Sequence, residues 1–581
     1  MIAENAVVVQ DESGWLHFAA PRRVLRAWTP REVRPALRTL AHAVEEEGLH
    51  AAGFLGYEAA AGLDAALTVN AAAPRLPLLW FGLYDLPERW QQLPRPASTY
   101  RLGQWQPDQT LPAYRAAIKA IKDAISRGET YQVNYTFALR TAWQGDPWAL
   151  FCDLAQAQRG RYAAYINLGE QAICCVSPEL FFRLEHGHIE ARPMKGTARR
   201  GLSVAEDQQQ RAALAASTKD RAENVMIVDM IRNDLGRVAE FGSVQVPALF
   251  TTERYPTLLQ MTSTVTAHTT APLDELLATL FPCASITGAP KARTMQWISR
   301  LEAAPRGVYT GTIGYAAPEG GARFNVAIRT VVVDQAAGEA SYGVGSGIVW
   351  DSEADAEYAE CLLKAQVLHE RLPHFDLLET MRWSRAAGVV RQQQHVARLL
   401  ASADYFGFAV EARQVQHLLN QLDAAALPDP ARLRLLLAGD GTLRLDVEPL
   451  TLPAAAAPHL RLALAAAPIN SRELFLYHKT TQRAVYEQAR AAHPDYDEVL
   501  LWNERGELTE ATTANVVLAL EDRWVTPPVS SGLLPGVLRG ELLAAGRIHE
   551  QVITVEQVRQ ARALYLINSL RGWRAGKVVF R

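Results

Sequence analysis

The chain has 581 residues, of which 21% are charged and 49% hydrophobic, so it can bury a large core and extensive disorder is not expected. At roughly 100 to 200 residues per domain, this length predicts two large units or three to four smaller ones. Its 59 Lys and Arg residues against 62 Asp and Glu residues give a net charge of −3, which excludes a global basic field for nucleic acid or anionic membranes.

Cysteine usage and the apolar pattern predict a cytoplasmic protein. The five cysteines are odd in number and form no Cys-x-x-Cys pair, which argues against a disulfide framework and a zinc knuckle. The first residues, MIAENAVVVQDE, lack a basic stretch before an apolar core, and the sequence has no uninterrupted apolar run of about 20 residues. We therefore expect neither export nor a membrane span.

Alanine-rich helical stretches alternate along the chain with short β-branched runs such as AIRTVVV (327–333), which predicts α/β or α+β domains. An amphipathic helix is expected over 355–372, and it stops at Pro373 before a new apolar segment, FDLLETMRW. We therefore predict a first unit over 1–372 and a second unit over 373–581.

Two segments of the first unit each place a pair of carboxylates three residues apart, Asp220 with Glu223 and Glu357 with Glu360. On helices, residues three apart share one face, so the two pairs could converge on one cation. A few hard oxygen ligands, completed by waters and an anionic substrate, favour Mg²⁺ over zinc. The alternative is that these carboxylates are ordinary solvated surface residues.

The glycine-rich run GVGSGIV (343–349) lies beside a predicted strand. Its backbone N–H groups could form a nest that holds an anion. A simple tight turn explains the same pattern equally well, so both interpretations stay open at this point.

Five further segments complete a pattern with the two acidic segments. They are SPELFFRLE (177–185), RPMKGTARRG (192–201), ASITGAPKARTM (284–295), VYTGTIGY (308–315) and AIRTVVV (327–333). Together they resemble the chorismate-utilising enzymes, which comprise anthranilate synthase large subunits, aminodeoxychorismate synthase component I and isochorismate synthases. The resemblance runs from about residue 50 to 370. It implies a large α/β sandwich with a chorismate-binding core at about 110–370, and a deep site in which chorismate is held through Mg²⁺.

The resemblance also assigns a metal set and a substrate set. Glu223 and Glu360 are implied as the metal ligands, with Asp220 and Glu357 in support. The residues implied to hold the substrate carboxylates and ring are Thr287, Tyr309, Arg329, Gly345 and Ser346, with assistance from Lys364. The alternative for each of them is a purely structural role.

One position distinguishes the branches of this family. The motif at 193–197 reads Pro-Met-Lys-Gly-Thr, and aminodeoxychorismate synthases carry this lysine where anthranilate synthases have alanine. The resemblance implies that Lys195 adds at C2 of chorismate and expels the C4 hydroxyl, after which ammonia enters at C4 and expels the lysine. Glu179 matches the general acid that protonates the departing hydroxyl. The alternative role for Lys195 is to anchor a carboxylate.

Isochorismate-forming relatives place a water-activating lysine in the strand that here reads ETYQVNYT (129–136), but this chain has Gln132. A neutral amide cannot abstract a proton from water, so the resemblance favours an enzyme that uses ammonia. No segment resembles a glutaminase with a nucleophilic cysteine in a glycine-rich elbow. The ammonia source is therefore expected to be a separate glutamine amidotransferase subunit, or free ammonia.

The second unit contains its own ordered set of motifs. They are FDLLETMRW (375–383), QHVARLLASADYFGF (394–408), YHKTTQRAVYEQAR (477–490), NERGELTEATTANVVL (503–518), SGLLPGVLRG (531–540) and INSLRG (567–572). Together they resemble the fold type IV pyridoxal-phosphate enzymes, which include branched-chain and D-amino acid aminotransferases and aminodeoxychorismate lyase. The resemblance covers nearly all of residues 375–581 and implies pyridoxal 5′-phosphate as cofactor.

Within that resemblance, Lys479 is implied to bind the cofactor covalently and to act as base, and Glu510 to pair with the pyridine nitrogen. Thr380 matches a threonine that assists proton transfer in the lyase branch. The residues implied to hold the phosphate and line the pocket are Arg398, Gly536, Val537, Leu538, Thr513, Asn515 and Ser569.

The two resemblances together predict consecutive steps of 4-aminobenzoate formation, which feeds folate synthesis. Chorismate and ammonia would give 4-amino-4-deoxychorismate, which would then lose pyruvate. The cofactor motifs do not separate a lyase from a transaminase, so the fusion context favours the lyase. The alternatives are an anthranilate synthase-like unit fused to an aminotransferase, and one inactive unit that serves as a scaffold. A homodimer through the second unit is the oligomer that the resemblance suggests.

Overall fold

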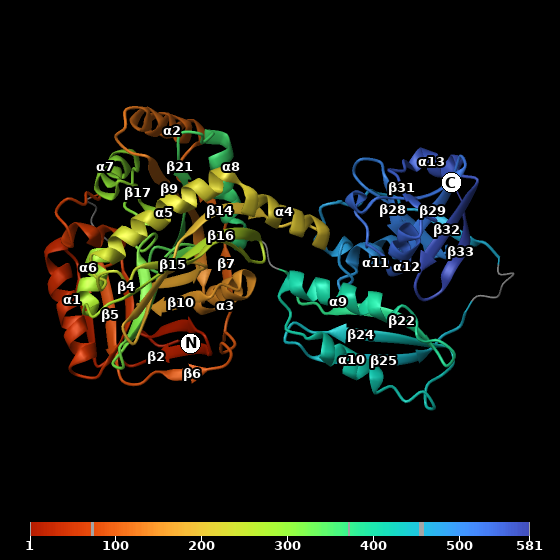
Figure 1. Cartoon of the computed structure of the whole chain (residues 1–581), viewed down its shortest axis with the longest axis horizontal. Helices are drawn as coiled ribbons and strands as arrows, with labels where there is room; N and C mark the ends of the chain where they lie inside the picture. The colour runs from red at the N-terminus through yellow and green to blue at the C-terminus, as the bar shows by residue number, and fades with distance from the viewer. Residues whose placement is uncertain (1, 71–74, 370–371, 453–457, 580–581) are drawn as a thin grey trace. The chain divides into compact units, whose positions relative to one another are not determined.

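The computed structural model describes residues 2–70, 75–369, 372–452 and 458–579 (Figure 1). The chain divides into two compact units. The first comprises Met1–Arg200 and Gln210–Leu372, and the second comprises Gly201–Gln209 and Pro373–Arg581. Within the described ranges, no helix is both long enough and apolar enough to cross a membrane.

The first unit contains two large sheets whose strands pair antiparallel. One runs in the order β17 (Gly288–Ala289), β9 (Gln132–Gly145), β21 (Glu339–Ile348), β20 (Thr330–Asp334), β11 (Gln171–Ser177), β10 (Tyr162–Asn167), β1 (Val7–Asp11), β2 (Gly14–Phe18) and β6 (Glu88–Trp90). The other runs β14 (Met194–Arg199), β16 (Leu258–His268), β13 (His188–Arg192), β12 (Leu180–Glu185), β19 (Gly321–Val326), β18 (Thr312–Ala317), β4 (His50–Leu55), β5 (Leu79–Tyr84) and β3 (Arg23–Ala27).

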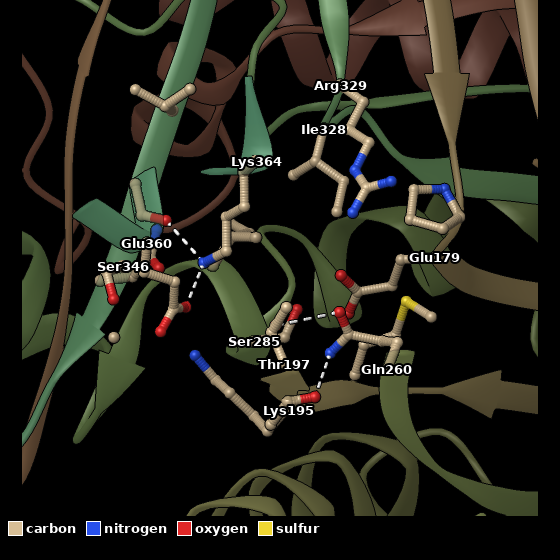
Figure 2. A pocket seen from close by; sticks show the side chains of 18 of the residues that line it. Glu179, Lys195, Thr197, Gln260, Ser285, Ile328, Arg329, Ser346, Glu360 and Lys364 are labelled. Carbon is tan, nitrogen blue, oxygen red and sulfur yellow. Dashed lines mark hydrogen bonds and ion pairs between the residues drawn. The ribbon is translucent and has the colours of Figure 1, made fainter. Parts of the chain in front are cut away.

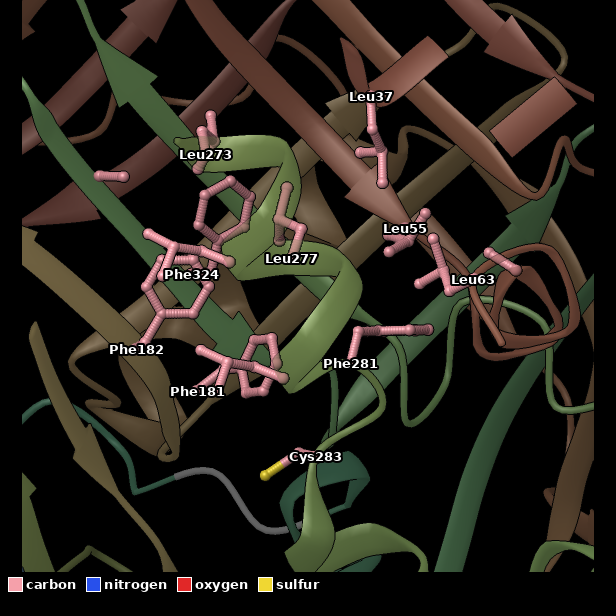
Figure 3. Packing of buried hydrophobic residues seen from close by; sticks show 14 of the residues in the cluster. Leu37, Leu55, Leu63, Phe181, Phe182, Leu273, Leu277, Phe281, Cys283 and Phe324 are labelled. Carbon is pink, nitrogen blue, oxygen red and sulfur yellow. The ribbon is translucent and has the colours of Figure 1, made fainter. Parts of the chain in front are cut away.

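These sheets form the two inner layers of a helix–sheet–sheet–helix sandwich. Between them, Val7 of β1 and Ile166 of β10 belong to one apolar cluster with Phe54 of β4 and Trp80 of β5. The helices α1 (Pro30–Glu45) and α6 (Leu273–Leu280) cover the outer face of the second sheet, and Figure 3 shows leucines of α6 over phenylalanines of β12 and β19. The helices α2 (Leu111–Ser126), α3 (Pro147–Gln158) and α8 (Ala354–Lys364) cover the outer face of the first sheet. Each fully buried Leu or Phe in such a layer contributes about 1.5 to 3 kcal/mol to stability.

The two acidic pairs of the first unit lie on helices, as the spacing indicated. Ser217 caps α5 (Thr218–Gly236), because its hydroxyl accepts a hydrogen bond from the Asp220 N–H at 3.2 Å. In α8, Glu357 lies in the first turn and Lys364 in the last, where each charge is favourable to the helix dipole. The helix expected over 355–372 is shorter: α8 ends at Lys364, a 3₁₀ turn follows at Gln366–Leu368, and residues 370–371 lie outside the described ranges.

The glycine-rich run is neither a nest nor a tight turn, so both interpretations of it were wrong. It is extended within β21 and pairs along its length with β9, with Gly345 opposite Thr136. The glycines instead make room for other groups: a Cβ atom at Gly343 would lie 2.2 Å from ring atoms of Tyr309. Close approach of a side chain to the backbone, rather than anion binding by a turn, explains glycine there.

The second unit contains two smaller sheets. The four-stranded sheet runs β23 (Gly388–Val389), β22 (Leu377–Ser384), β24 (Ala431–Leu437) and β25 (Leu443–Pro449). The eight-stranded sheet runs β28 (Leu508–Ala511), β27 (Glu498–Trp502), β26 (Leu460–Leu464), β33 (Gly572–Val578), β32 (Ala563–Asn568), β29 (Asn515–Leu520), β30 (Arg523–Thr526) and β31 (His549–Glu550). The helices include α9 (Gln392–Phe406), α10 (Ala412–Asn420), α11 (Ala484–Ala491), α12 (Val537–Ala544) and α13 (Val555–Gln560).

Candidate active sites

A cavity of about 130 Å³ in the first unit lies between β14, the glycine-rich end of β21, α5 and α8. Most of the residues predicted for the first site line it: Glu179, Lys195, Asp220, Glu223, Tyr309, Arg329, Gly345, Ser346, Glu357, Glu360 and Lys364. Figure 2 shows side chains of Glu179, Lys195, Arg329, Glu360 and Lys364 around this space. Segments that are far apart in the sequence therefore converge on one polar site.

Lys195 enters the cavity from β14 and touches the opposite strand. A Cβ atom at Gly347 would lie 2.7 Å from Lys195 Nζ and 2.4 Å from Gln132 Nε2, so the glycine permits this approach. Burial holds the pKa of Lys195 below its ordinary value; Glu223 opposes this effect and Lys364 reinforces it. The lowered pKa increases the fraction of neutral amine, which is the nucleophilic form.

Glu179 is buried in the same cavity. Burial raises its pKa to about 7, against the opposing effects of the Ser285 hydroxyl and Lys195. Its Oε1 atom is buried and has no hydrogen-bond partner among the described residues. A carboxyl group with this pKa is partly protonated near neutral pH and can donate a proton into the cavity.

Three of the four acidic residues on the two helices have different charged or polar neighbours. Burial raises the pKa of Glu223 to about 7, although Lys195 and Lys219 counteract it. In spite of burial, the ion pair with Lys364 at 2.8 Å lowers the pKa of Glu360. Glu357 accepts a hydrogen bond from Ser346 and lies 3.7 Å from Lys219 Nζ.

The donor set fits Mg²⁺ if substrate and water complete the coordination. Across the ranges that the structure describes, no three His, Cys, Asp or Glu side chains form a ready-made metal cluster. Mg²⁺ commonly takes only one or two protein carboxylates and fills its other positions with waters and substrate oxygens. Glu223 and Glu360 line one cavity and supply hard oxygens, and a cation would offset the burial that disfavours ionised Glu223.

The predicted substrate residues separate into two groups. Arg329 lines the cavity with its Nη1 atom buried and unpaired within the described part of the chain, and its φ of 50° is left-handed. Such a backbone is strained for arginine and is typical of functional sites. Thr287 does not line the cavity; its buried hydroxyl donates to the Cys283 carbonyl oxygen at 3.1 Å. Thr287 is therefore a predicted substrate residue that does not line the cavity, although its neighbours Ser285 and Ile286 do.

The sequence interpretation missed several wall residues, including Asn134, Lys219, Gln260 and Ser285. Gln260 on β16 donates to the Gly196 carbonyl oxygen at 2.9 Å and accepts from the Thr197 hydroxyl at 3.1 Å. It therefore braces the two residues that follow Lys195. No local pattern marks it, because its place depends on the pairing of β16 with β14.

A second cavity, of about 390 Å³, lies in the second unit. It brings together every residue predicted for that site: Thr380, Arg398, Lys479, Glu510, Thr513, Asn515, Gly536, Val537, Leu538 and Ser569. Burial lowers the pKa of Lys479 to about 8, and the nearby Arg398 reinforces it while Glu379 opposes it. The amine is thus partly neutral near neutral pH and available to attack a carbonyl carbon.

Glu510 is held in place by three donors. Its carboxylate accepts hydrogen bonds from the Tyr486 hydroxyl at 2.7 Å, the Asn515 amide at 3.1 Å and the Leu534 N–H at 3.1 Å. Burial nevertheless raises its pKa to about 7, so a cationic partner would stabilise its charged form. This environment fits the pyridine nitrogen of a pyridoxal ring.

One wall of the second cavity suits a phosphate group. Gly536 caps α12, whose first backbone N–H groups face outward from the helix start, and a Cβ atom at Gly536 would lie 2.0 Å from Asn515 Oδ1. Arg398 donates to both carboxylate oxygens of Glu379 at 2.8 and 2.7 Å. The residues present therefore fit pyridoxal 5′-phosphate, with a lysine for its aldehyde and this wall for its phosphate.

The sequence interpretation did not single out the partners that hold these groups. Glu379 also accepts from His395 Nδ1 at 2.7 Å, and His395 Nε2 lies 2.8 Å from the Ser569 hydroxyl. Glu379 precedes Thr380 directly, and His395 lies three residues before Arg398 on α9. The spacing of His395 and Arg398 on one helix face is the signal that could have indicated His395. Glu379 could have been indicated only by its position next to Thr380.

Comparison with known proteins adds family matches to this geometry. Residues 4–370 match the model of the chorismate binding enzyme family, and residues 376–578 match the model of the class IV amino-transferases. The anthranilate synthase component I structure from Streptococcus pneumoniae TIGR4 covers 63% of this chain and 92% of its own, with a TM-score of 0.53 and 22% identity. That likeness shows the fold of the first unit.

Two curated relatives are closer in sequence. An aminodeoxychorismate synthase of Streptomyces pristinaespiralis is 44% identical over 306 residues, which cover 52% of this chain and 40% of that protein. Aminodeoxychorismate synthase component 1 of Salmonella typhimurium is 40% identical over 312 residues, which cover 53% of this chain and 68% of that protein. The chain therefore spans only part of the length of each relative.

Proposed function

The chain belongs to the chorismate binding enzymes, and because its chorismate-binding domain is followed by a class IV aminotransferase domain, we propose that it makes 4-aminobenzoate from chorismate in two steps. The observation that carries the proposal is the pair of buried lysines, Lys195 and Lys479, each with a lowered pKa and each lining its own cavity. The first cavity would form 4-amino-4-deoxychorismate and the second would remove pyruvate from it.

In the first step, the Lys195 amine attacks C2 of chorismate, and the C4 hydroxyl leaves as water with a proton from Glu179. Ammonia then forms a bond to C4 and expels the Lys195 amine from C2. The atoms balance as chorismate plus ammonia giving 4-amino-4-deoxychorismate plus water. Glu223 and Glu360 would hold Mg²⁺, which when bound neutralises the substrate carboxylates. Ammonia would come from a glutamine amidotransferase subunit.

In the second step, Lys479 and Glu510 would bind the aldehyde and the pyridine nitrogen of pyridoxal 5′-phosphate, and Arg398 with the α12 N-terminus would hold its phosphate. When bound, the cofactor supplies an electron sink for the substrate amine. The Lys479 amine would take the proton from ring C4, with Thr380 beside it. The bond from C3 to the enolpyruvyl oxygen then breaks, the enolpyruvate gains a proton to become pyruvate, and the ring becomes aromatic.

The full chain supplied with chorismate, Mg²⁺, pyridoxal 5′-phosphate and ammonium is expected to release 4-aminobenzoate and pyruvate in equal amounts. Liquid chromatography with mass detection measures both products. With cofactor-free protein and no added pyridoxal 5′-phosphate, 4-amino-4-deoxychorismate is expected to accumulate instead. Formation of the ortho isomer, anthranilate, would contradict the proposal for the first unit.

The pH dependence of the first step tests the role of Glu179. Because burial raises its pKa to about 7, the proton-donating form is present below pH 7 and is lost above it. We expect kcat/KM for chorismate, measured at constant free ammonia, to fall as pH rises through about 7. Glu179→Gln is expected to lower this value about 10²- to 10⁴-fold and to remove that limb of the pH profile. An unchanged profile in the variant would assign the titration to another group.

A further inference from the structure

Residues 201–209 belong to the second compact unit although they interrupt the sequence of the first, and we call them the crossover segment. Side chains at the start of the helix that follows fix its backbone. The Gly201 N–H donates to the Asp207 carboxylate at 3.1 Å, and the Leu202 N–H donates to the Glu206 carboxylate at 2.9 Å. The crossover segment is therefore an ordered turn of the second unit.

The crossover segment packs against apolar side chains of both sheets of the second unit. Leu202 contacts the cluster that contains residues of β27, in the eight-stranded sheet. Val204 contacts the cluster that contains residues of β22 and β24, in the four-stranded sheet. The Tyr405 hydroxyl of α9 donates to the Gly201 carbonyl oxygen at 2.8 Å. Apolar contacts and a hydrogen bond thus hold the segment in this unit.

His478, which directly precedes Lys479, binds the crossover segment. Its Nε2 atom lies 3.1 Å from the Leu202 carbonyl oxygen. A carbonyl oxygen can only accept a hydrogen bond, so Nε2 carries a hydrogen and donates it. The Nδ1 atom lies 3.0 Å from the Ser402 hydroxyl of α9, and the residue is only 2% exposed. The imidazole is therefore fixed between the segment and α9.

The backbone of Lys479 is held by β22. Its carbonyl oxygen accepts a hydrogen bond from the Leu378 N–H at 2.9 Å, and the next residue, Thr480, forms a β-bridge with Leu377. Lys479 lines the second cavity, whereas His478 does not. The imidazole therefore restrains the chain just before the lysine, and β22 restrains it at and after the lysine.

We propose that His478 is a positioning residue for Lys479 and that the crossover segment is a required part of the second site. This inference rests on the proposed role of Lys479 in binding the cofactor aldehyde. If the segment leaves its place, the buried imidazole loses its bond to Leu202, and the chain before Lys479 loses a restraint. The amine then spends less time buried in the cavity. Residues 373–581 by themselves would therefore form an incomplete second unit.

Capture of pyridoxal 5′-phosphate by the cofactor-free full chain tests the inference. The Lys479 nitrogen forms a double bond to the aldehyde carbon, and the aldehyde oxygen leaves as water. Burial lowers the pKa of this amine to about 8, so the capture rate should rise with pH around a midpoint near 8. Reduction with borohydride and peptide mass measurement verify the modified residue. The charged groups near the amine, which no test variant changes, are Arg398, Glu379, Arg483 and Glu510.

His478→Phe removes both hydrogen bonds of the imidazole but keeps an aromatic ring. The rings of Tyr405 and Phe406, with centroids 4.3 and 4.7 Å from that of the imidazole, retain a packing partner. We expect the capture midpoint to rise by about one pH unit and the rate at pH 7 to fall about tenfold, because a less buried amine returns toward its ordinary pKa. His478→Gln keeps an N–H donor and is expected to recover most of the rate.

Hydrogen exchange of the same cofactor-free proteins measures the crossover segment directly. The amides of residues 201–209 are expected to exchange about tenfold faster in His478→Phe than in the wild type, the value of one lost hydrogen bond. Tyr405→Phe removes the bond to Gly201 and leaves His478 and the cavity wall in place. It should also speed the exchange, and it should raise the capture midpoint by less than His478→Phe does.

His493→Phe is the matched control. The Nδ1 atom of His493 lies 3.1 Å from the Ala489 carbonyl oxygen and its ring is near Tyr496, so this variant also removes a partly buried imidazole that contacts a backbone carbonyl. It should leave the capture midpoint and the exchange of residues 201–209 unchanged.

An unchanged midpoint in His478→Phe, or an equal rise in His493→Phe, would overturn the inference. If His478→Phe does not fold, Tyr405→Phe decides the question by the same two measurements. A wild-type chain whose crossover segment is protected from exchange, but whose Lys479 captures no cofactor, would instead refute the proposed function of the second unit.

Discussion

Lys195→Ala is expected to lower formation of 4-amino-4-deoxychorismate by about 10³-fold or more, because the proposed first step loses its covalent nucleophile. The amine lies against Gly347 on the opposite strand, inside the cavity. Any residual product should shift toward anthranilate, since ammonia can then attack C2 directly. Product ratios from chorismate, Mg²⁺ and ammonium measure both effects.

The matched control is Lys219→Ala, which removes another amine from the same cavity wall. Lys219 lies 3.7 Å from Glu357 and is half exposed, so its loss changes the local charge without removing the nucleophile. We expect less than about a tenfold decrease, in keeping with an exposed ion pair. If Lys195→Ala retained the wild-type yield of 4-aminobenzoate, Lys195 would be a carboxylate anchor or a structural residue.

Lys479→Ala is expected to abolish release of pyruvate and 4-aminobenzoate, by about 10³-fold or more, while the first step continues. The variant loses the amine that would bind the cofactor aldehyde and take the C4 proton. It should therefore accumulate 4-amino-4-deoxychorismate, and its cofactor absorbance should match that of free pyridoxal 5′-phosphate. Lys577→Ala, which changes an exposed lysine of the same unit, should leave both properties unchanged.

Mixing the two inactive variants separates the two activities cleanly. Lys479→Ala supplies the intermediate, and the second unit of Lys195→Ala should convert it, so the mixture is expected to produce 4-aminobenzoate after a lag. A mixture that makes the intermediate but never consumes it would show that the second unit does not accept the intermediate from solution.

The overall architecture was largely predictable because local sequence motifs indicate both domains. Both family resemblances are confirmed by the matches over 4–370 and 376–578, and the predicted α/β sandwich followed by a fold type IV domain is confirmed with them. The glycine run at 343–349 was misjudged because its glycines were interpreted as either an anion-binding nest or a tight turn, whereas long-range pairing with β9 keeps them extended. Packing of Gly201–Gln209 with the second unit had no local signal either.

Site residues that belong to a sequence motif could be predicted. Site residues that are positioned only by tertiary contacts could not. Residue spacing indicated the acidic helices, and the resemblances indicated both lysines. By contrast, Thr287 shares a motif with cavity residues but does not line the cavity, and its hydroxyl donates a hydrogen bond to the Cys283 carbonyl oxygen.

Lys479 also has a consequence for the abundance of the protein. A lysine whose pKa falls from 10.5 to about 8 on folding makes the folded state about 3 kcal/mol less favourable at neutral pH, and this penalty fades only as pH rises from about 8 toward 10.5. A newly made chain without its cofactor would therefore begin with a weakened second unit. Vitamin B6 shortage is then expected to reduce the amount of intact enzyme in a cell, through proteolysis, as well as its catalytic output.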